Sequence, residues 1–138
     1  METIMKITKY LPATTVYAHC DLPCGVYDPA QARIEAESVL AICKKYAKST
    51  GESEIVFRQR AIMIKEERAE LVKHHLLVLW TDYFKPEHLE AHPTLHDLFW
   101  RAAKQAGLAK HHTDVDTAQK LLDLIAEITD VFNATKKA

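Results

Sequence analysis

The sequence predicts an all-α protein, a four-helix bundle that follows an irregular N-terminal segment. Apolar residues recur at helical spacing along most of the chain. Only 3 glycines are present, and no Asn-Gly or Asp-Gly dipeptide offers a hairpin turn. A chain of 138 residues with ordinary composition suits one compact domain.

The first two helices are expected over about 28–48 and 53–83. Asp28 before Pro29 is typical of a helix N-cap followed by proline at the first helical position, and Thr50-Gly51 ends this helix. Its apolar face contains Ile34, Val39, Ile42 and Tyr46. The second helix, which Pro86 stops, should turn Ile55, Ile62, Leu71 and Val78 inward and present Lys65, Glu66, Arg68 and Glu70 as its more polar side.

Two further helices complete the predicted bundle. Pro93 opens the third, which runs through Leu95, Leu98, Phe99 and Ala102 to a stop at Gly107. Thr113 with Asp116 resembles a capping box for the fourth, which carries Leu121, Leu122, Ile125, Ile128 and Phe132. Four helices with short connections favour a bundle, an architecture that by itself does not identify a function.

Charge and hydropathy exclude two classes of partner. A formal net charge of -1 argues against general affinity for nucleic acid or anionic membranes. The chain lacks an apolar run of the roughly 18 residues that a membrane span needs, so we expect a soluble protein without a membrane partner.

Residues 1–18 are expected to be a propeptide that is cleaved after Ala18. Lys6 and Lys9 precede Val16-Tyr17-Ala18, a small-residue cleavage pattern that is also typical of export signals. An export signal needs an uninterrupted apolar core, which this segment lacks because of Thr8, Lys9, Pro12, Thr14 and Thr15. A propeptide and a cytoplasmic location are therefore favoured, with residues 19–138 as the functional domain.

The chemistry is expected in the segment 19–27, directly before the first helix. Cys20 and Cys24 are separated by a short loop that contains Pro23, and Gly25 follows. Such a loop can fold back so that both thiols meet one metal ion. Structural zinc needs four closed ligands, and a second Cys or His pair at suitable spacing is not evident. The adjacent pairs His74-His75 and His111-His112 are interpreted as solvated or packing histidines.

Residues 19–39 resemble the N-terminal hook and first helix of the nickel superoxide dismutase family. The sequence from His19 to Pro29 reads His-Cys-Asp-Leu-Pro-Cys-Gly-Val-Tyr-Asp-Pro. Further matches are 64–71, Lys73-His74-His75, Val78-Leu79-Trp80, 82–86 and the closing 135–138. The similarity covers nearly everything after Ala18, and the hook motif defines the family's metal site.

The resemblance implies one nickel ion per subunit, held by residues of the hook. Its ligands would be the thiolates of Cys20 and Cys24, the amine and imidazole of His19, and the backbone amide nitrogen of Cys20. The planar sulfur and nitrogen donors suit Ni(II). A Ni(II)/Ni(III) couple would oxidise one superoxide to oxygen and reduce the next to hydrogen peroxide. Cleavage after Ala18 would create the amine, since the nitrogen of a peptide bond lacks a lone pair for a metal.

The resemblance also implies roles for residues around the hook. Glu35 would fix the axial imidazole and Arg68 would fix Glu35, although a helix-surface ion pair is the plainer interpretation. Tyr27, also expected to act in catalysis, and Asp21 would lie beside the open face where superoxide approaches. Tyr83 and Lys85 would support the hook from a neighbouring subunit, because members of the family assemble as homohexamers.

Two alternatives use the same residues differently. The protein could instead be a non-catalytic helical protein that binds or transports nickel or copper, and a structural zinc hook is a third possibility. Cys43 lies within the first helix and is interpreted as a buried thiol that packs as a small apolar side chain. Trp80 and Trp100 are interpreted as core or interface residues.

Overall fold

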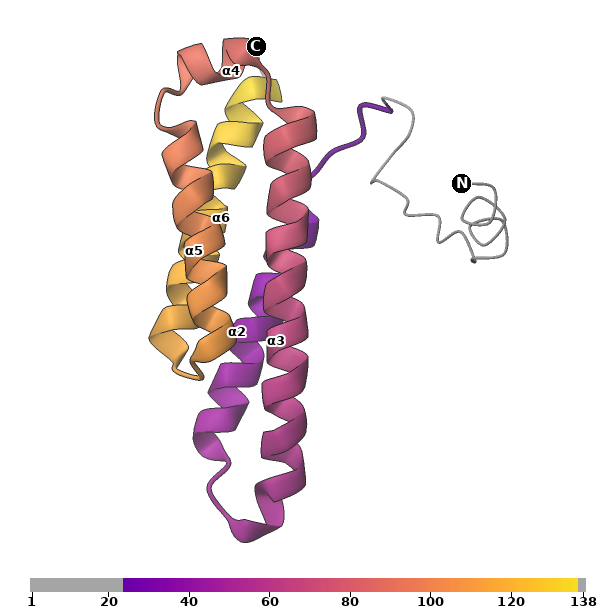
Figure 1. Cartoon of the computed structure of the whole chain (residues 1–138), viewed down its shortest axis with the longest axis vertical. Helices are drawn as coiled ribbons and strands as arrows, with labels where there is room; N and C mark the ends of the chain where they lie inside the picture. Colours follow the sequence, from indigo (N-terminus) through magenta and orange to yellow (C-terminus); the bar gives the residue numbers. More distant parts are fainter. Residues whose placement is uncertain (1–23, 137–138) are drawn as a thin grey trace, which may run out of the picture.

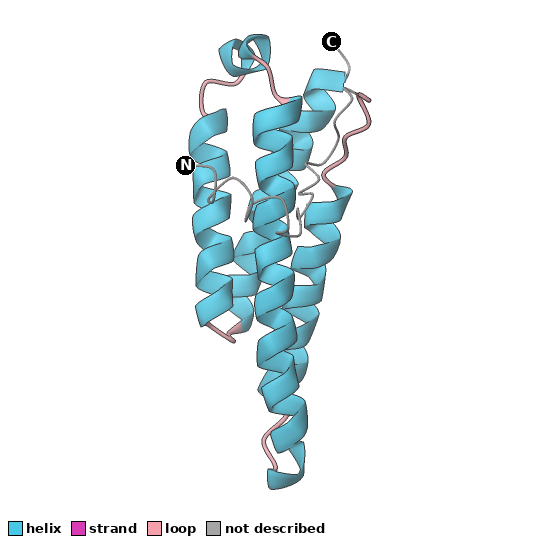
Figure 2. Cartoon of the chain, turned by 45° about the vertical axis from the view of Figure 1, so that its right-hand side comes forward, coloured by secondary structure: helices cyan, strands magenta, loops and turns pink. Residues whose placement is uncertain are grey.

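The computed structural model describes residues 24–136, which form a helical bundle (Figure 1). Four long helices make up the bundle: α2 (Ala30–Lys48), α3 (Ile55–Val78), α5 (Leu95–His111) and α6 (Val115–Lys136). Around the bundle lie the 3₁₀ turn η1 (Glu52–Glu54), the π-helical turn η2 (Leu79–Tyr83) and the short helix α4 (Pro86–Ala91). Within the described residues no strand is present, as Figure 2 shows. The predicted all-α bundle is confirmed.

Each long helix packs against two others, in the cyclic order α2, α3, α5, α6. The core between them contains Val39, Val72, Leu76, Leu98, Phe99, Leu121, Ile125 and Ile128, each almost fully buried. The α2–α3 hairpin extends beyond the loop that joins α5 to α6, so its lower end projects from the bundle (Figures 1 and 2). None of the described helices is long and apolar enough to cross a membrane.

The helix starts follow the predicted capping chemistry with small shifts. Helix α2 begins at Ala30, one residue after Pro29, the predicted first helical position, and the Asp28 carboxylate accepts a hydrogen bond from the Ala30 N–H at 2.7 Å. At the start of α6 the capping carboxylate belongs to Asp114, which accepts from the Thr117 N–H at 2.7 Å. The expected capping box of Thr113 with Asp116 is therefore wrong by one residue.

Two predicted boundaries are also wrong. Helix α5 begins at Leu95, two residues after Pro93, and it does not stop at Gly107 but continues to His111. A Cβ atom at Gly107 would lie 3.6 Å from the Lys73 ammonium nitrogen, an ordinary contact distance, so this helical position does not require glycine. Pro86, predicted to stop the second helix, is the first residue of the short helix α4, which was not predicted.

The inward face of α3 differs from the predicted face. Ile55 and Ile62 are exposed. Ile55 is the first residue of α3, and Ile62 precedes Lys65, which contacts the C-terminal end of α5, so both residues lie toward the tip of the α2–α3 hairpin. Lys65, assigned to the polar side, is only 2% exposed. Its ammonium group donates hydrogen bonds to the carbonyl oxygens of Ala109 and Lys110 at the C-terminal end of α5. A cation at this end is stabilised by the helix dipole, which offsets part of the cost of its burial.

Candidate metal centre

The described structure contains only the end of the predicted hook. His19, Cys20 and Asp21 lie outside the described residues, whereas Cys24 and Tyr27 lie within them. Cys24 is exposed at the start of the segment that leads into α2. Its sulfur accepts a hydrogen bond from the Val26 N–H at 3.4 Å.

Gly25 provides the backbone turn directly after Cys24. Its φ angle is +71°, in the left-handed region that residues with a Cβ atom rarely adopt. A Cβ at this position would meet no other atom within 4 Å, so the requirement for glycine arises from the backbone alone. The turn therefore fixes the direction in which the chain leaves Cys24 toward Tyr27.

A cavity of about 320 Å³ lies beside Cys24. The segment before α2 contributes Cys24, Val26, Tyr27 and Asp28 to its wall, and the helices contribute Gln31, His75, Val78 and Leu79. The sequence interpretation missed His75 and Gln31 as neighbours of Cys24. The run Lys73-His74-His75, which resembles the family sequence, could have indicated a histidine near the hook. Only the packing of α3 shows that His75 lines the cavity.

Tyr83 supports Tyr27 from the last position of η2. Their ring centroids are 5.6 Å apart. The Tyr83 hydroxyl lies 2.7 Å from Thr135 Oγ1, which in turn donates its hydrogen to the Phe132 carbonyl oxygen at 2.6 Å. The Tyr83 hydroxyl must therefore be the donor to Thr135. The contact with Tyr27 is made within one chain, and support from a neighbouring subunit stays a prediction.

Lys85 lies just beyond this contact. It is exposed and precedes α4, with its backbone N–H donating to His88 Nδ1 at 3.1 Å. Its side chain is thus presented to solvent at the same end of the bundle as Tyr83.

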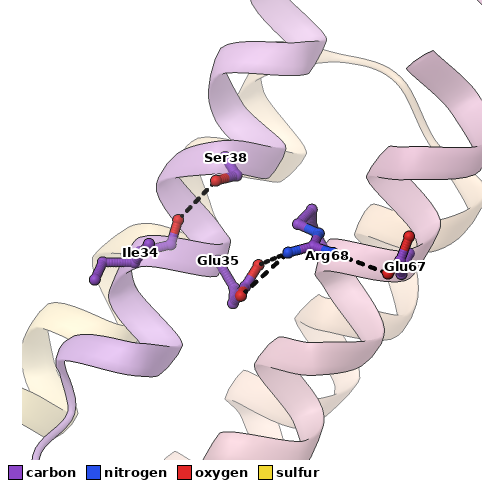
Figure 3. A network of polar contacts seen from close by, with 5 residues as sticks. All are labelled: Ile34, Glu35, Ser38, Glu67 and Arg68. Carbon is purple, nitrogen blue, oxygen red and sulfur yellow. Dashed lines mark hydrogen bonds and ion pairs between the residues drawn. The ribbon is translucent and has the colours of Figure 1, made fainter. Parts of the chain in front are cut away.

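Glu35 and Arg68 meet between α2 and α3, as Figure 3 shows. Arg68 Nη1 lies 3.2 Å and 3.4 Å from the two carboxylate oxygens of Glu35. Glu67 contacts the other side of the guanidinium at 2.9 Å, but its side chain is 64% exposed whereas that of Glu35 is 15% exposed. The predicted pairing of Glu35 with Arg68 is therefore present, and its role toward the imidazole of His19 stays a prediction.

Arg68 also carries an unsatisfied donor. Its Nε atom is buried and has no hydrogen-bond partner within residues 24–136. Buried donors in proteins almost always have a partner. Arg68 Nε is therefore a buried donor for which residues 24–136 supply no acceptor.

Cys43 lies away from this site, in the core of the bundle. It is 1% exposed, and burial raises the pKa of its thiol. A thiol that resists ionisation is a poor metal ligand, so the interpretation of Cys43 as a packing residue is confirmed by its burial. Within residues 24–136 no three Cys, His, Asp or Glu side chains form a group that could hold a metal ion.

The family model and the relatives with similar sequences point to the same protein family. A sequence model of nickel-containing superoxide dismutase matches residues 14–136. The chain is 58% identical to superoxide dismutase (Ni) of Streptomyces seoulensis over 129 residues, which cover 94% of this chain and 96% of the relative. It is 57% identical over the same length to the protein of that name from Streptomyces coelicolor.

Solved structures agree with this result. A crystal structure of nickel-containing superoxide dismutase after partial X-ray-induced reduction superposes with a TM-score of 0.82 at 60% identity. A native nickel superoxide dismutase structure superposes with a TM-score of 0.81 at 57% identity. In both cases 87% of this chain covers 100% of the solved chain.

Proposed function

Because this chain belongs to the nickel-containing superoxide dismutase family, we infer that it converts superoxide into oxygen and hydrogen peroxide at a nickel centre. The observation that carries this conclusion is the match of the family over residues 14–136, a range that includes the whole hook motif. The curated relatives are named as enzymes, so a non-catalytic nickel or copper carrier is not favoured. The fold and the family predicted from the sequence are both confirmed.

We assign the nickel ion to the hook, with His19, Cys20 and Cys24 as its ligands. Thiolate sulfur and nitrogen donors suit nickel in a planar site. The exposed Cys24 and the Gly25 turn fit such a hook, because the sulfur lies at the mouth of a cavity rather than in the core. When bound, nickel supplies a Ni(II)/Ni(III) couple that can accept an electron from one superoxide and give it to the next.

The surrounding residues position the substrate and the hook. Tyr27 lines the cavity beside Cys24 and presents a phenol there, while Asp21 is proposed to flank the same approach. The Glu35 carboxylate is proposed to hold the ring of His19, and Arg68 holds Glu35. The orphan Nε of Arg68 supports this arrangement, since it leaves one donor for an acceptor in the hook.

The active form is proposed to begin at His19. The match to the solved relative spans 87% of the 138 residues of this chain and the whole of the solved chain. This share is about 120 residues, which equals the length of the segment 19–138. While Ala18 is joined to His19, the nitrogen of His19 is a planar amide without a lone pair for the metal. A protease that cleaves after Ala18 is therefore a required partner, and a cytoplasmic location is proposed because 1–18 lacks an uninterrupted apolar core.

A homohexamer is proposed as the assembled state. The projecting part of α3 exposes apolar side chains, among which Val56 is 66% and Met63 72% exposed. A cavity of about 440 Å³ lies on the same surface and includes Val56, Phe57 and Ile64. Contiguous apolar surface of this kind marks a protein contact, and a second copy of the chain is the proposed occupant. Light scattering of the nickel-loaded protein would give its mass directly.

The proposed function is tested by comparing full-length protein with protein that begins at His19. Each is supplied with nickel under reducing conditions, and its metal content, intact mass and superoxide consumption are measured. We expect stoichiometric nickel and rapid superoxide loss only in the form that begins at His19. Full activity in a sample whose mass still includes residues 1–18 would refute the amine ligand.

A further inference from the structure

A continuous series of aromatic rings leads from the cavity beside Cys24 to the surface of α5. Tyr27 lines that cavity and lies 5.6 Å from Tyr83. From Tyr83 the successive ring centroids are 5.0 Å, 5.5 Å and 6.1 Å apart, through Phe84, Phe99 and Trp80. The π-helical turn η2 contributes both Trp80 and Tyr83, so one irregular turn holds the two oxidisable ends of this inner stretch.

Trp80, the last ring of the series, makes a hydrogen bond that apolar packing does not require. Trp80 Nε1 donates a hydrogen bond to His96 Nδ1 at 2.8 Å, and His96 is exposed to solvent. Oxidation of an indole makes its N–H strongly acidic. An imidazole nitrogen at hydrogen-bond distance can accept that proton, which lowers the energy needed to remove an electron from Trp80.

The second tryptophan provides a contrast within the same molecule. Trp100 lies on α5, is 58% exposed and has the Lys104 ammonium 5.6 Å from its ring centroid. Trp100 is thus the tryptophan more open to solvent oxidants, and Trp80 is the one connected through rings to Tyr27.

We propose that this series of rings is a protective electron route, through which Trp80 supplies an electron to Tyr27 when an oxidant forms beside Cys24. The inference rests on the proposed function, because hydrogen peroxide is a product of the reaction at that place. Reduced nickel, which His19, Cys20 and Cys24 would hold, would supply one electron to hydrogen peroxide, and with one proton the peroxide would give water and a hydroxyl radical. Without a nearby electron donor this radical attacks the thiolates of the hook, whose oxidation beyond the sulfenic state is irreversible.

Electrons and protons are conserved in each step of the proposed route. The hydroxyl radical takes an electron and a proton from the Tyr27 phenol, giving water and a phenoxyl radical. Trp80 then gives an electron to the phenoxyl radical through the intervening rings, and water returns a proton to Tyr27. The indole proton of Trp80 passes to His96 Nδ1 and from the exposed imidazole to solvent. A small soluble thiol finally gives a hydrogen atom to the Trp80 radical and leaves as a thiyl radical.

The route predicts that oxidation will not follow exposure. Nickel-loaded protein beginning at His19 is treated with hydrogen peroxide, without added thiol, and oxidised residues are located by tandem mass spectrometry. We expect several-fold more oxidation at the partly buried Trp80 than at Trp100. In metal-free protein treated with hydroxyl radicals generated in bulk solution, the order should reverse.

Two matched substitutions separate the route from simple packing. Trp80→Phe keeps a ring against Phe99 but removes the indole, so initial superoxide consumption should be unchanged while irreversible oxidation of Cys24 by peroxide rises several-fold. Trp100→Phe should leave oxidation of Cys24 as in the wild type. Freeze-quenched samples of the wild type should show a tryptophan radical by electron paramagnetic resonance, which Trp80→Phe removes and Trp100→Phe retains.

The outcomes also separate this inference from the function on which it rests. A protein that retains nickel and consumes superoxide but oxidises Trp100 before Trp80 would overturn the electron route and leave the dismutase function standing. Equal Cys24 oxidation in wild type and Trp80→Phe would overturn it as well. If protein that begins at His19 neither retained nickel nor consumed superoxide, both the electron route and the dismutase function would be overturned.

Discussion

The ion pair between Glu35 and Arg68 offers the sharpest test of the site, because two roles for it predict effects of different size. Glu35→Gln keeps the shape of the side chain and removes its charge. The pair is partly buried, with its closest contact at 3.2 Å, so its loss should lower the free energy of unfolding by about 1 kcal/mol. If Glu35 also holds the imidazole of His19, nickel affinity or turnover should fall by roughly 10- to 100-fold.

Stability alone cannot produce such a loss of activity. A domain stable by about 5 kcal/mol or more that loses about 1 kcal/mol still keeps over roughly 99% of its molecules folded. A tenfold fall in turnover at 25 °C would therefore report the hook and not the fold. Nickel content after dialysis, the rate of superoxide loss by stopped flow and urea unfolding measure the three quantities separately.

Glu67 supplies a matched control on the same guanidinium. It contacts Arg68 at 2.9 Å but its side chain is 64% exposed, so Glu67→Gln should change stability by less than about 1 kcal/mol and leave turnover unaltered. Wild-type nickel content and turnover in Glu35→Gln, accompanied by the small loss of stability, would refute the assignment of Glu35 to the hook. The pair would then be an ordinary contact between two helices.

Three further predictions concern single groups. Cys24→Ser should abolish both stoichiometric nickel retention and superoxide consumption, whereas Cys43→Ser, at a buried position, should retain both. Loss of nickel from Cys43→Ser together with nickel retention by Cys24→Ser would exclude the hook as the metal site. His19→Ala should retain nickel through its backbone amine but lose most turnover, and wild-type turnover would contradict an axial imidazole. Burial lowers the pKa of Lys65 below its ordinary 10.5, so the unfolded chain holds this proton to higher pH than the folded chain does. The test compares Cys43→Ser with Cys43→Ser/Lys65→Met. The difference in their free energies of unfolding should rise with pH between the lowered pKa of Lys65 and 10.5. A difference that does not change with pH in urea unfolding would contradict this.

The sequence by itself determined the class of fold and the chemistry of the hook. Helical periodicity, proline at helix starts and the scarcity of glycine are local properties, and each long helix was predicted close to its place. The proposed ligands His19, Cys20 and Cys24 lie close together in the sequence, so one short segment was enough to predict a nickel site. The pairing of Glu35 with Arg68 was also expected, but only through the resemblance to the family.

Only the tertiary structure decided which residues from distant segments meet. Lys65 looks like a surface charge in the sequence, and it is buried because the C-terminal carbonyls of α5 end opposite it. Ile55 and Ile62 look like core residues, yet both are exposed, because α3 with 24 residues is longer than its neighbour α5 with 17 residues and its first turns extend past the end of α5. The π-helical turn η2 contributes Tyr83 and Trp80, whose hydrogen bonds to Thr135 and His96 join segments that are distant in the sequence. Periodicity assigns a residue to a side of its own helix, but the neighbour on that side is set by how long the other helices are and where they end.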